Sequence, residues 1–489
     1  MAATEKIRKP PDQMAEGMLH ISLVGIGGDK IAEGTWHRSC NMLELFRIAH
    51  RSKPGLQIQL LHGSSKLNPQ MSLDFLDLNL GCVSLTVCFS KVAKKQQPFS
   101  LGTAFAAIKD DGSVVTWGNA DHGGNSSSVA DKLQEGVVQV DANKNAFAAV
   151  KDDGSVVTWG KADCGGDSSS VEGKLQEGVV QVAGSHFAFA AVKDDGSVVT
   201  WGNAASGGDS SSVADKLQEG VVQVAGNGQA FAAIKDDGSV VTWGLTDLGG
   251  ESSSVEEKLQ DGVVQVAGNS YAFAAVKDDG SVVTWGISYG GGDSSSVADK
   301  LQEGVVQVAG NDGAFAAVKE DGSVVTWGNA HYGGDSSSFA DKLQEGVVQV
   351  AGNECAFAAI KDDGSVVTWG LIDLGGDSSS VADKLQEGVS QVAGSGHAFA
   401  AVKKGGSVVT WGGADHGGDS SSVADKLQEG IVQVAGNYFA FAAVRDDGSV
   451  VTWGNAHYGG DSSSVADKLQ EGVVEIAGNS NAFAAAKDD

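Results

Sequence analysis

The 489-residue sequence predicts a mainly β protein: a repeat β-propeller of four-stranded blades that follows a small α+β domain. Tryptophans recur every 42 residues from Trp117 to Trp453 without a slip. Phenylalanines recur at the same interval from Phe105 to Phe483. A fixed period of this length is typical of repeat proteins, in which each unit buries its apolar faces against its neighbours. The repeat domain is expected over residues 101–489.

Each repeat is expected to supply four short strands. In the second repeat, AFAAV (146–150) and SVVTW (155–159) are β-prone runs joined by Lys-Asp-Asp-Gly, a tight hairpin signal. SSSV (168–171) is expected as a further strand, after which Ser170 opens a brief helical turn, and VVQVAG (179–184) as another. The tryptophans are expected in the blade core. Four strands with tight connections describe a propeller blade.

The blade sequence VVQVAGSHFAFAAVKDDGSVVTWGNAASGGDSSSV (179–213) resembles the repeat of the regulator of chromosome condensation (RCC) superfamily. It is closest in style to the propeller-type β-lactamase inhibitory proteins, and the resemblance covers residues 104–489. Family members that exchange guanine nucleotides carry a His in the loop before the Ala-rich strand, together with irregular insertions. This chain lacks both features, which puts that activity in doubt.

The two ends of the repeat region leave its closure open. The family usually has seven blades, whereas this chain has nine Trp-Gly strands and nine VVQV-like strands. A closed nine-bladed ring and an open spiral of blades both fit this count. If residues 473–476 paired beside the strands of the first repeat, the ring would close as a composite blade.

The N-terminal part predicts a small separate domain. Residues 1–17 are polar with two adjacent prolines and are expected to be a disordered leader. Over residues 18–91 two short strands precede an amphipathic helix at 40–52, and further alternating strands follow. Residues 92–100 then form a linker.

This order, and LLHGSSKL (60–67) in particular, resembles the ubiquitin-like β-grasp domain. Leu61 lies where that family commonly shows an exposed apolar residue used for docking. The last strand runs on without a Gly-Gly tail, so conjugation to other proteins is not supported. A β-grasp domain with no tie to ubiquitin biology is the alternative.

The charge is strongly acidic and unevenly distributed. Residues 1–100 hold 12 of the 34 Lys and Arg residues and 8 of the 62 Asp and Glu residues, which leaves 22 against 54 in the repeats. Such a field repels nucleic acid and anionic lipid, and it favours basic protein partners. Five scattered cysteines, the absence of a secretory signal and the absence of a long apolar run indicate a cytoplasmic or nuclear protein with reduced thiols.

Most of each repeat is copied almost verbatim, and the differences fall in two windows. One is the four residues after Trp-Gly, and the other is the three residues before AFAA. Antiparallel strands bring both windows to the same end of each blade. Bulky variable loops on a rigid scaffold are typical of a binding surface, whereas neutral drift of loop tips is the alternative. The candidate partner-binding residues are His122, Cys164, His186, Phe187, Leu248, Tyr271, Tyr289, His331, Tyr332, Leu374, His397, His416, Tyr438, Phe439, His457 and Tyr458.

Other chemistry is less well supported. His122, Cys164 and His186 could form a zinc site across adjacent blades, but their separations match no ligand motif. Asp110 and Asp111 could bind calcium weakly, but they are also standard turn formers. No constellation of nucleophile, base and orienting group is found, so neither an enzyme nor a cofactor is expected. The sequence therefore predicts a protein-binding adaptor or scaffold, with a guanine-nucleotide exchange regulator and a purely structural array as alternatives.

Overall fold

The computed structural model describes residues 18–25, 30–37, 45, 57–62, 65–66, 73, 83–90, 102–109 and 111–487. The chain divides into two compact units, Met1–Lys94 and Lys95–Asp489. The predicted leader (1–17) and linker (92–100) lie outside the described residues. No helix in the described ranges is long and apolar enough to cross a membrane.

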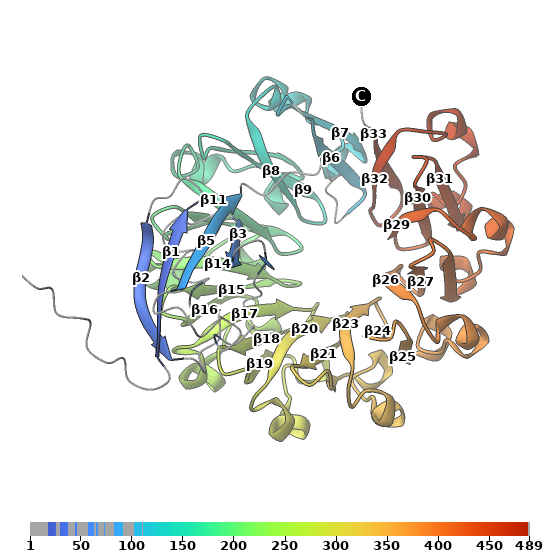
Figure 1. Cartoon of the computed structure of the whole chain (residues 1–489). Coiled ribbons are helices and arrows are strands. Elements are labelled where there is room, and N and C mark those ends of the chain that lie inside the picture. Colours follow the sequence, from blue (N-terminus) through green and yellow to red (C-terminus); the bar gives the residue numbers. More distant parts are fainter. Residues whose placement is uncertain are drawn as a thin grey trace, which may run out of the picture. The chain divides into compact units, whose positions relative to one another are not determined.

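The first unit contains one mixed five-stranded sheet (Figure 1). Its strands are β1 (Met18–Gly25), β2 (Lys30–His37), β3 (Gln57–His62), β4 (Ser65–Lys66) and β5 (Val83–Ser90). Their order is β2-β1-β5-β3-β4, in which β1 and β5 run parallel and the other neighbours antiparallel.

Alternate side chains of the first unit's central strands form its core. Ile21, Leu23, Leu85 and Val87 are fully buried, and the residues between them are half-buried. This period of two places one apolar face of the sheet against the rest of the unit. Of the helix predicted at 40–52, only Leu45 is described; it is helical and belongs to the same core.

The second unit repeats a hairpin followed by 3-10 helices, with one further strand in front. The VVQV-like first strands are β8 (Val137–Ala142), β11 (Val179–Gly184), β14 (Val221–Gly226), β17 (Val263–Gly268), β20 (Val305–Gly310), β23 (Val347–Gly352), β26 (Val389–Gly394), β29 (Ile431–Gly436) and β32 (Val473–Gly478). The Ala-rich second strands are β6 (Ala104–Ile108), β9 (Ala146–Lys151), β12 (Ala188–Lys193), β15 (Ala230–Lys235), β18 (Ala272–Lys277), β21 (Ala314–Lys319), β24 (Ala356–Lys361), β27 (Ala398–Lys403), β30 (Ala440–Arg445) and β33 (Phe483–Lys487). The Trp-bearing third strands are β7 (Val114–Gly118), β10 (Val156–Gly160), β13 (Val198–Gly202), β16 (Val240–Gly244), β19 (Val282–Gly286), β22 (Val324–Gly328), β25 (Val366–Gly370), β28 (Val408–Gly412) and β31 (Val450–Gly454).

Two 3-10 helices follow each third strand. The short ones are η2 (Ala120–His122), η4 (Ala162–Cys164), η6 (Ala204–Ser206), η8 (Thr246–Leu248), η10 (Ser288–Gly290), η12 (Ala330–Tyr332), η14 (Ile372–Leu374), η16 (Ala414–His416) and η18 (Ala456–Tyr458). The longer ones are η3 (Ser127–Leu133), η5 (Ser169–Lys174), η7 (Ser211–Leu217), η9 (Ser253–Leu259), η11 (Ser295–Leu301), η13 (Ser337–Lys342), η15 (Ser379–Leu385), η17 (Ser421–Leu427) and η19 (Ser463–Lys468).

The prediction of four strands in each blade is wrong. Each complete sheet has three strands, and the SSSV segment begins a 3-10 helix. In the second repeat, the Asp167 carboxylate accepts a hydrogen bond from the Ser169 amide at 2.9 Å, and the Val171 amide donates to the Ser168 carbonyl at 3.0 Å. These local bonds take up backbone donors that a fourth strand would need for its ladder.

The tight hairpin between the second and third strands is confirmed. Gly154 has a φ of 76°, a conformation that favours glycine, and its amide donates to the carbonyl of Lys151 at 2.9 Å. The carboxylate of Asp153 accepts from the Ser155 amide at 2.9 Å. The paired aspartates of the repeat therefore act as turn formers here.

The tryptophans belong to the core between blades, as predicted. The ring of Trp243 is buried and stacks on Phe231 at 5.3 Å between centroids. The small alanines of the preceding repeat's second strand, such as Ala190, complete the packing. Trp117 in the first repeat differs, since it is 36% exposed.

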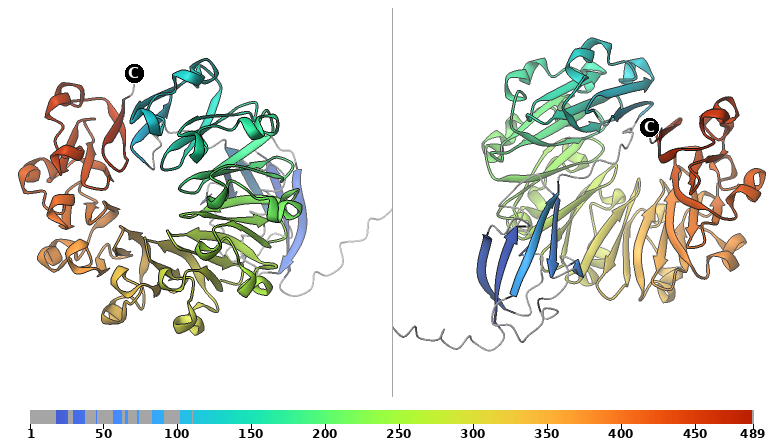
Figure 2. Two further views of the ribbon diagram at one scale, coloured as in Figure 1. Left: turned by 180° about the vertical axis from the view of Figure 1, so that it is seen from behind. Right: turned by 45° about the horizontal axis from the view of Figure 1, so that its top comes forward.

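The composite blade that would close the ring, one of the two alternatives left open by the sequence, is not formed. Strand β32 pairs with β33, and β6 pairs with β7, so two two-stranded sheets flank eight three-stranded ones in the described residues. Figure 2 shows the sheets of this unit following one another around a common centre. The amide of Ser480 donates to the carbonyl of Gly102 at 3.0 Å, which joins the last repeat to the first.

Candidate protein-binding surface

The two variable windows meet in each repeat. The amide of Lys161, in the window after Trp-Gly, donates to the carbonyl of Asn145, in the window before AFAA, at 2.9 Å. This contact follows from the antiparallel pairing of β9 and β10, which brings the start of β9 beside the end of β10. We call the surface formed by the paired windows of all repeats the loop face.

A buried side chain latches the two windows together. The amide group of Asn143 donates to the carbonyl of Cys164 at 2.7 Å, and its oxygen accepts from the amides of Asn145 and Ala146, both at 2.9 Å. We call residues at this position latch residues. The equivalent side-chain hydrogen bond to a carbonyl of the other window is made by Ser185, Asn227, Asn269, Asn311, Asn353, Ser395 and Asn437. The position belongs to a variable window, although every repeat from the second onward has Asn or Ser there.

The predicted site residues differ in exposure. Tyr289 is 51% exposed, and His331 and His457 are also exposed. Cys164 and Leu248 are buried, at 4% and 8%, and lie beneath the loops rather than on the surface. The half-buried residues are His122, His186, Phe187, Tyr271, Tyr332, Leu374, His397, His416, Tyr438, Phe439 and Tyr458. In the first unit, Leu61 is half-buried and pairs with Lys66.

Five of these side chains form one continuous group, the five-ring cluster. Its members are His397, His416, Tyr438, Phe439 and Tyr458. Within a repeat, the centroids of His397 and His416 lie 4.2 Å apart, and those of Phe439 and Tyr458 lie 4.1 Å apart. Between repeats, His416 stacks on Phe439 at 5.2 Å, and Tyr438 contacts His397 at 5.4 Å. The rings of two successive repeats thus make one half-buried aromatic surface.

Smaller aromatic contacts lie elsewhere on the loop face. The rings of Tyr271 and Tyr289 are 5.0 Å apart, and His186 contacts Phe187 edge-on at 5.9 Å. Burial and the nearby Lys144 ammonium lower the pKa of His186 to about 4. This imidazole is therefore neutral near pH 7.

The middle residues of successive loops are joined by backbone hydrogen bonds, which we call the loop ladder. The Asp312 amide donates to the Glu354 carbonyl at 3.3 Å, and the Glu354 amide donates to the Gly396 carbonyl at 3.2 Å. The Gly396 amide donates to the Tyr438 carbonyl at 3.0 Å. The ladder therefore places Asp312, Glu354 and Tyr438 in one row along the loops of successive repeats.

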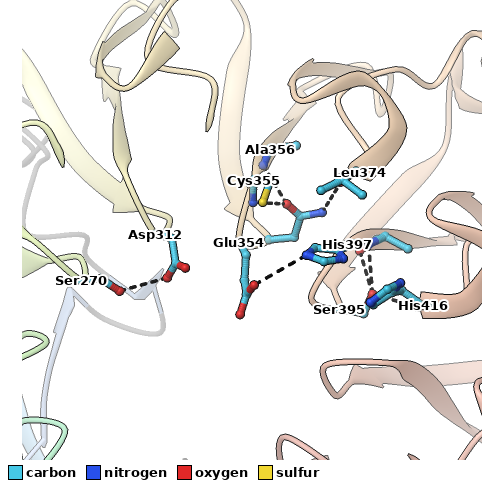
Figure 3. Close-up of polar contacts among 11 residues, drawn as sticks. Ser270, Asp312, Glu354, Cys355, Ala356, Leu374, Ser395, His397 and His416 are labelled. Carbon is cyan, nitrogen blue, oxygen red and sulfur yellow. Dashed lines mark hydrogen bonds and ion pairs between the residues drawn. The ribbon is translucent and has the colours of Figure 1, made fainter. Parts of the chain in front are cut away.

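Side chains along the ladder contact one another (Figure 3). The hydroxyl of Ser270 donates to the Asp312 carboxylate at 3.0 Å, and a Glu354 oxygen lies 3.8 Å from Nε2 of His397. Burial and the charge of the Glu354 carboxylate raise the pKa of Tyr438 to about 12. Burial and the charge of Asp312 raise the pKa of Glu354. Glu354 thus lies next to the five-ring cluster, and the half-buried Asp312 lies on the neighbouring loop.

The residues considered for a zinc site make other contacts. His122 is hydrogen-bonded to Thr103 at 2.8 Å, and Cys164 lies 3.7 Å from the amide of Asn145. Over the ranges that the structure describes, no three His, Cys, Asp or Glu side chains gather closely enough to hold a metal ion.

Comparison with known proteins identifies no family for this chain. No protein-family model matches it, and no curated protein matches it. Structures of low similarity include Prp20p from Saccharomyces cerevisiae, at 18% identity over 60% of this chain and 85% of that one, with a TM-score of 0.32. Human WBSCR16 matches at 16% identity over 82% and 90%, with a TM-score of 0.33, and the computationally designed Ika8 protein at 17% over 65% and 99%, with a TM-score of 0.30.

Proposed function

We propose that the repeat unit is a non-enzymatic adaptor that binds a protein partner through the loop face. The observation that supports this best is the five-ring cluster. Aromatic side chains that are half-buried and held by a rigid scaffold are the residues that dominate protein–protein binding energy. The rings are contributed by loops at matching positions of successive repeats, and the latch residues beneath fix their backbone.

The distribution of the variation favours recognition over neutral drift. Drift of exposed loop tips would favour polar residues, yet Tyr438, Phe439 and Tyr458 pack directly on one another. The opposite end of each blade repeats the Asp-Asp-Gly turn with little change. A repeat protein that binds a partner requires one face whose side chains differ between repeats, on a scaffold that is otherwise uniform.

The first unit is proposed to be a ubiquitin-like β-grasp domain that docks a second partner near Leu61. The mixed sheet with parallel central strands β1 and β5 supports this assignment. A link to the ubiquitin pathway is part of the same proposal. It is tested by titrating the full chain with ubiquitin and observing whether Leu61→Ala weakens any binding.

The loop-face proposal is tested by site-specific photo-cross-linking in the full chain. A photoreactive phenylalanine analogue replaces Tyr458, and in a matched control it replaces Phe339, which lies in η13 outside both windows. The cross-linked protein is identified, purified and titrated against the wild type. The double variant Tyr438→Ser/Phe439→Ser should bind it far more weakly, whereas Phe339→Val, which restores the residue of the other repeats, should not. Equal affinities for all three proteins would exclude the loop face as the binding surface.

A further inference from the structure

We propose that the loop face binds an arginine side chain of its partner, with the guanidinium group held by Asp312 and Glu354 and stacked on the ring of Tyr438. This inference rests on the proposed function and specifies the chemistry of the partner.

The two carboxylates are fixed as near neighbours by the backbone. Asp312 and Glu354 are joined by the loop ladder at 3.3 Å, and both side chains are half-buried. Ser270 orients the first carboxylate through its hydroxyl, and an oxygen of the second lies 3.8 Å from Nε2 of His397. In the described part of the chain no lysine or arginine forms an ion pair with either one.

Neighbouring carboxylates that lose part of their hydration need a compensating cation. The nearest imidazole, His397, does not supply one, because burial and the neighbouring His416 lower its pKa and leave it neutral at pH 7. Lys144 is close enough to lower the pKa of Glu354, although it forms no ion pair with it in the described structure. The two carboxylates are therefore available to a positively charged side chain of a partner, with which Lys144 would compete.

The aromatic surroundings favour arginine among the possible cations. A guanidinium group stacks on aromatic faces and makes paired hydrogen bonds with carboxylates, whereas an ammonium group is a strongly hydrated point charge. The ring of Tyr438 contacts the ring of His397 at 5.4 Å, and Nε2 of His397 lies 3.8 Å from Glu354, so aromatic faces lie close to this carboxylate. The net charge of −28 adds a long-range attraction for a basic partner.

The test uses the full chain and a labelled peptide of alternating glycine and arginine, followed by fluorescence anisotropy at 0.15 M salt. A second peptide carries citrulline, which has the same shape without the charge, and a third carries lysine. The double variant Asp312→Asn/Glu354→Gln should lose about tenfold or more of the affinity for the arginine peptide. Thermal melts establish that this variant folds as the wild type does.

A matched control removes the same charge elsewhere. Glu345 and Glu387 are exposed residues outside both windows, and Glu345→Gln/Glu387→Gln should change the affinity less than about twofold. Lys144→Ala should tighten binding, because it removes the internal competitor. Equal losses in the two double variants, or equal affinity for the citrulline peptide, would overturn the inference.

The outcome also separates this inference from the proposed function. If the cross-linked partner is lost by Tyr438→Ser/Phe439→Ser but binds normally to Asp312→Asn/Glu354→Gln, the loop face is a binding surface and the arginine site is wrong. If neither double variant weakens the partner, the proposed function itself is wrong.

Discussion

The indole Nε1 of Trp159 donates a hydrogen bond of 3.0 Å to the carbonyl of Gly123, which belongs to the preceding repeat. The same bond recurs in every later repeat up to Trp453, which donates to Gly417. Each tryptophan therefore fills the core between its own blade and the preceding one, and its hydrogen bond links the two.

Replacing one of these tryptophans should destabilise the fold strongly. Trp243→Ala removes a fully buried ring and its bond to Gly207, at an expected cost of about 3–5 kcal/mol. The midpoint of chemical denaturation should fall accordingly. Trp117→Ala is the matched control, because that ring is 36% exposed, and it should cost clearly less. Similar losses in the two variants would contradict the assigned role of the interblade bond.

The latch residues should tolerate serine but not alanine. Asn227→Ala leaves the buried carbonyl of Leu248 and two backbone amides without their side-chain partner, which costs about 1–3 kcal/mol. Asn227→Ser should restore much of this, since Ser395 makes the equivalent bond to His416 in its own repeat. Thermal unfolding of the three proteins measures the difference, and identical midpoints for Asn, Ser and Ala would show that no latch exists.

Acid should loosen the Asp-Asp-Gly turns. The pKa of Asp153 is lowered by hydrogen bonds from Ser155, so this carboxylate stabilises the turn above its ordinary pKa of 3.8. The contribution is lost as the pH falls below that value toward the lowered pKa. The protection factor of the Ser155 amide, which is its exchange rate relative to the intrinsic rate at the same pH, should therefore fall at low pH. Ser407 provides an internal control, because its turn has Lys404 and Gly405 in place of the aspartates.

A second acid effect should come from His186. Its pKa in the folded protein, about 4, lies below the ordinary value of 6.5, so the folded state binds this proton less readily than the unfolded state does. Its contribution to stability is complete above pH 6.5 and declines as the pH falls toward 4. Histidine NMR titration should show the low pKa, and His186→Phe should remove this part of the pH dependence. A pKa near 6.5 would refute the burial argument.

The hairpins and the core followed from the sequence because their signals are local and repeated. Lys-Asp-Asp-Gly between two β-prone runs leaves few alternatives to a hairpin, and a tryptophan in each repeat needs a buried position. The SSSV segment was misjudged because serine and aspartate side chains bond to their own backbone. Such bonds, like that from Ser169 to Asp167, compete with a strand ladder and decide the local structure.

The sequence predicts which loops carry the candidate surface but not how deeply each side chain is buried. All sixteen repeat residues proposed for binding lie in the paired windows, yet Cys164 and Leu248 are buried. They occupy the same position as Tyr332 and Tyr458, the last residue of the short 3-10 helix. Leu374 at this same position is half-buried, so the residue type alone does not decide the depth. The carboxylate pair was missed because Asp312 and Glu354 are 42 residues apart, and only the loop ladder makes them neighbours.

The central claim is that the loop face is the recognition surface, and hydrogen–deuterium exchange of the full chain with and without its cross-linked partner tests it most directly. The account predicts that binding slows exchange in the windows at 437–439 and 455–458 and leaves the turn at 445–449 unchanged. Protection of the turn, with the windows unaffected, would place the partner on the opposite end of the blades and contradict the account.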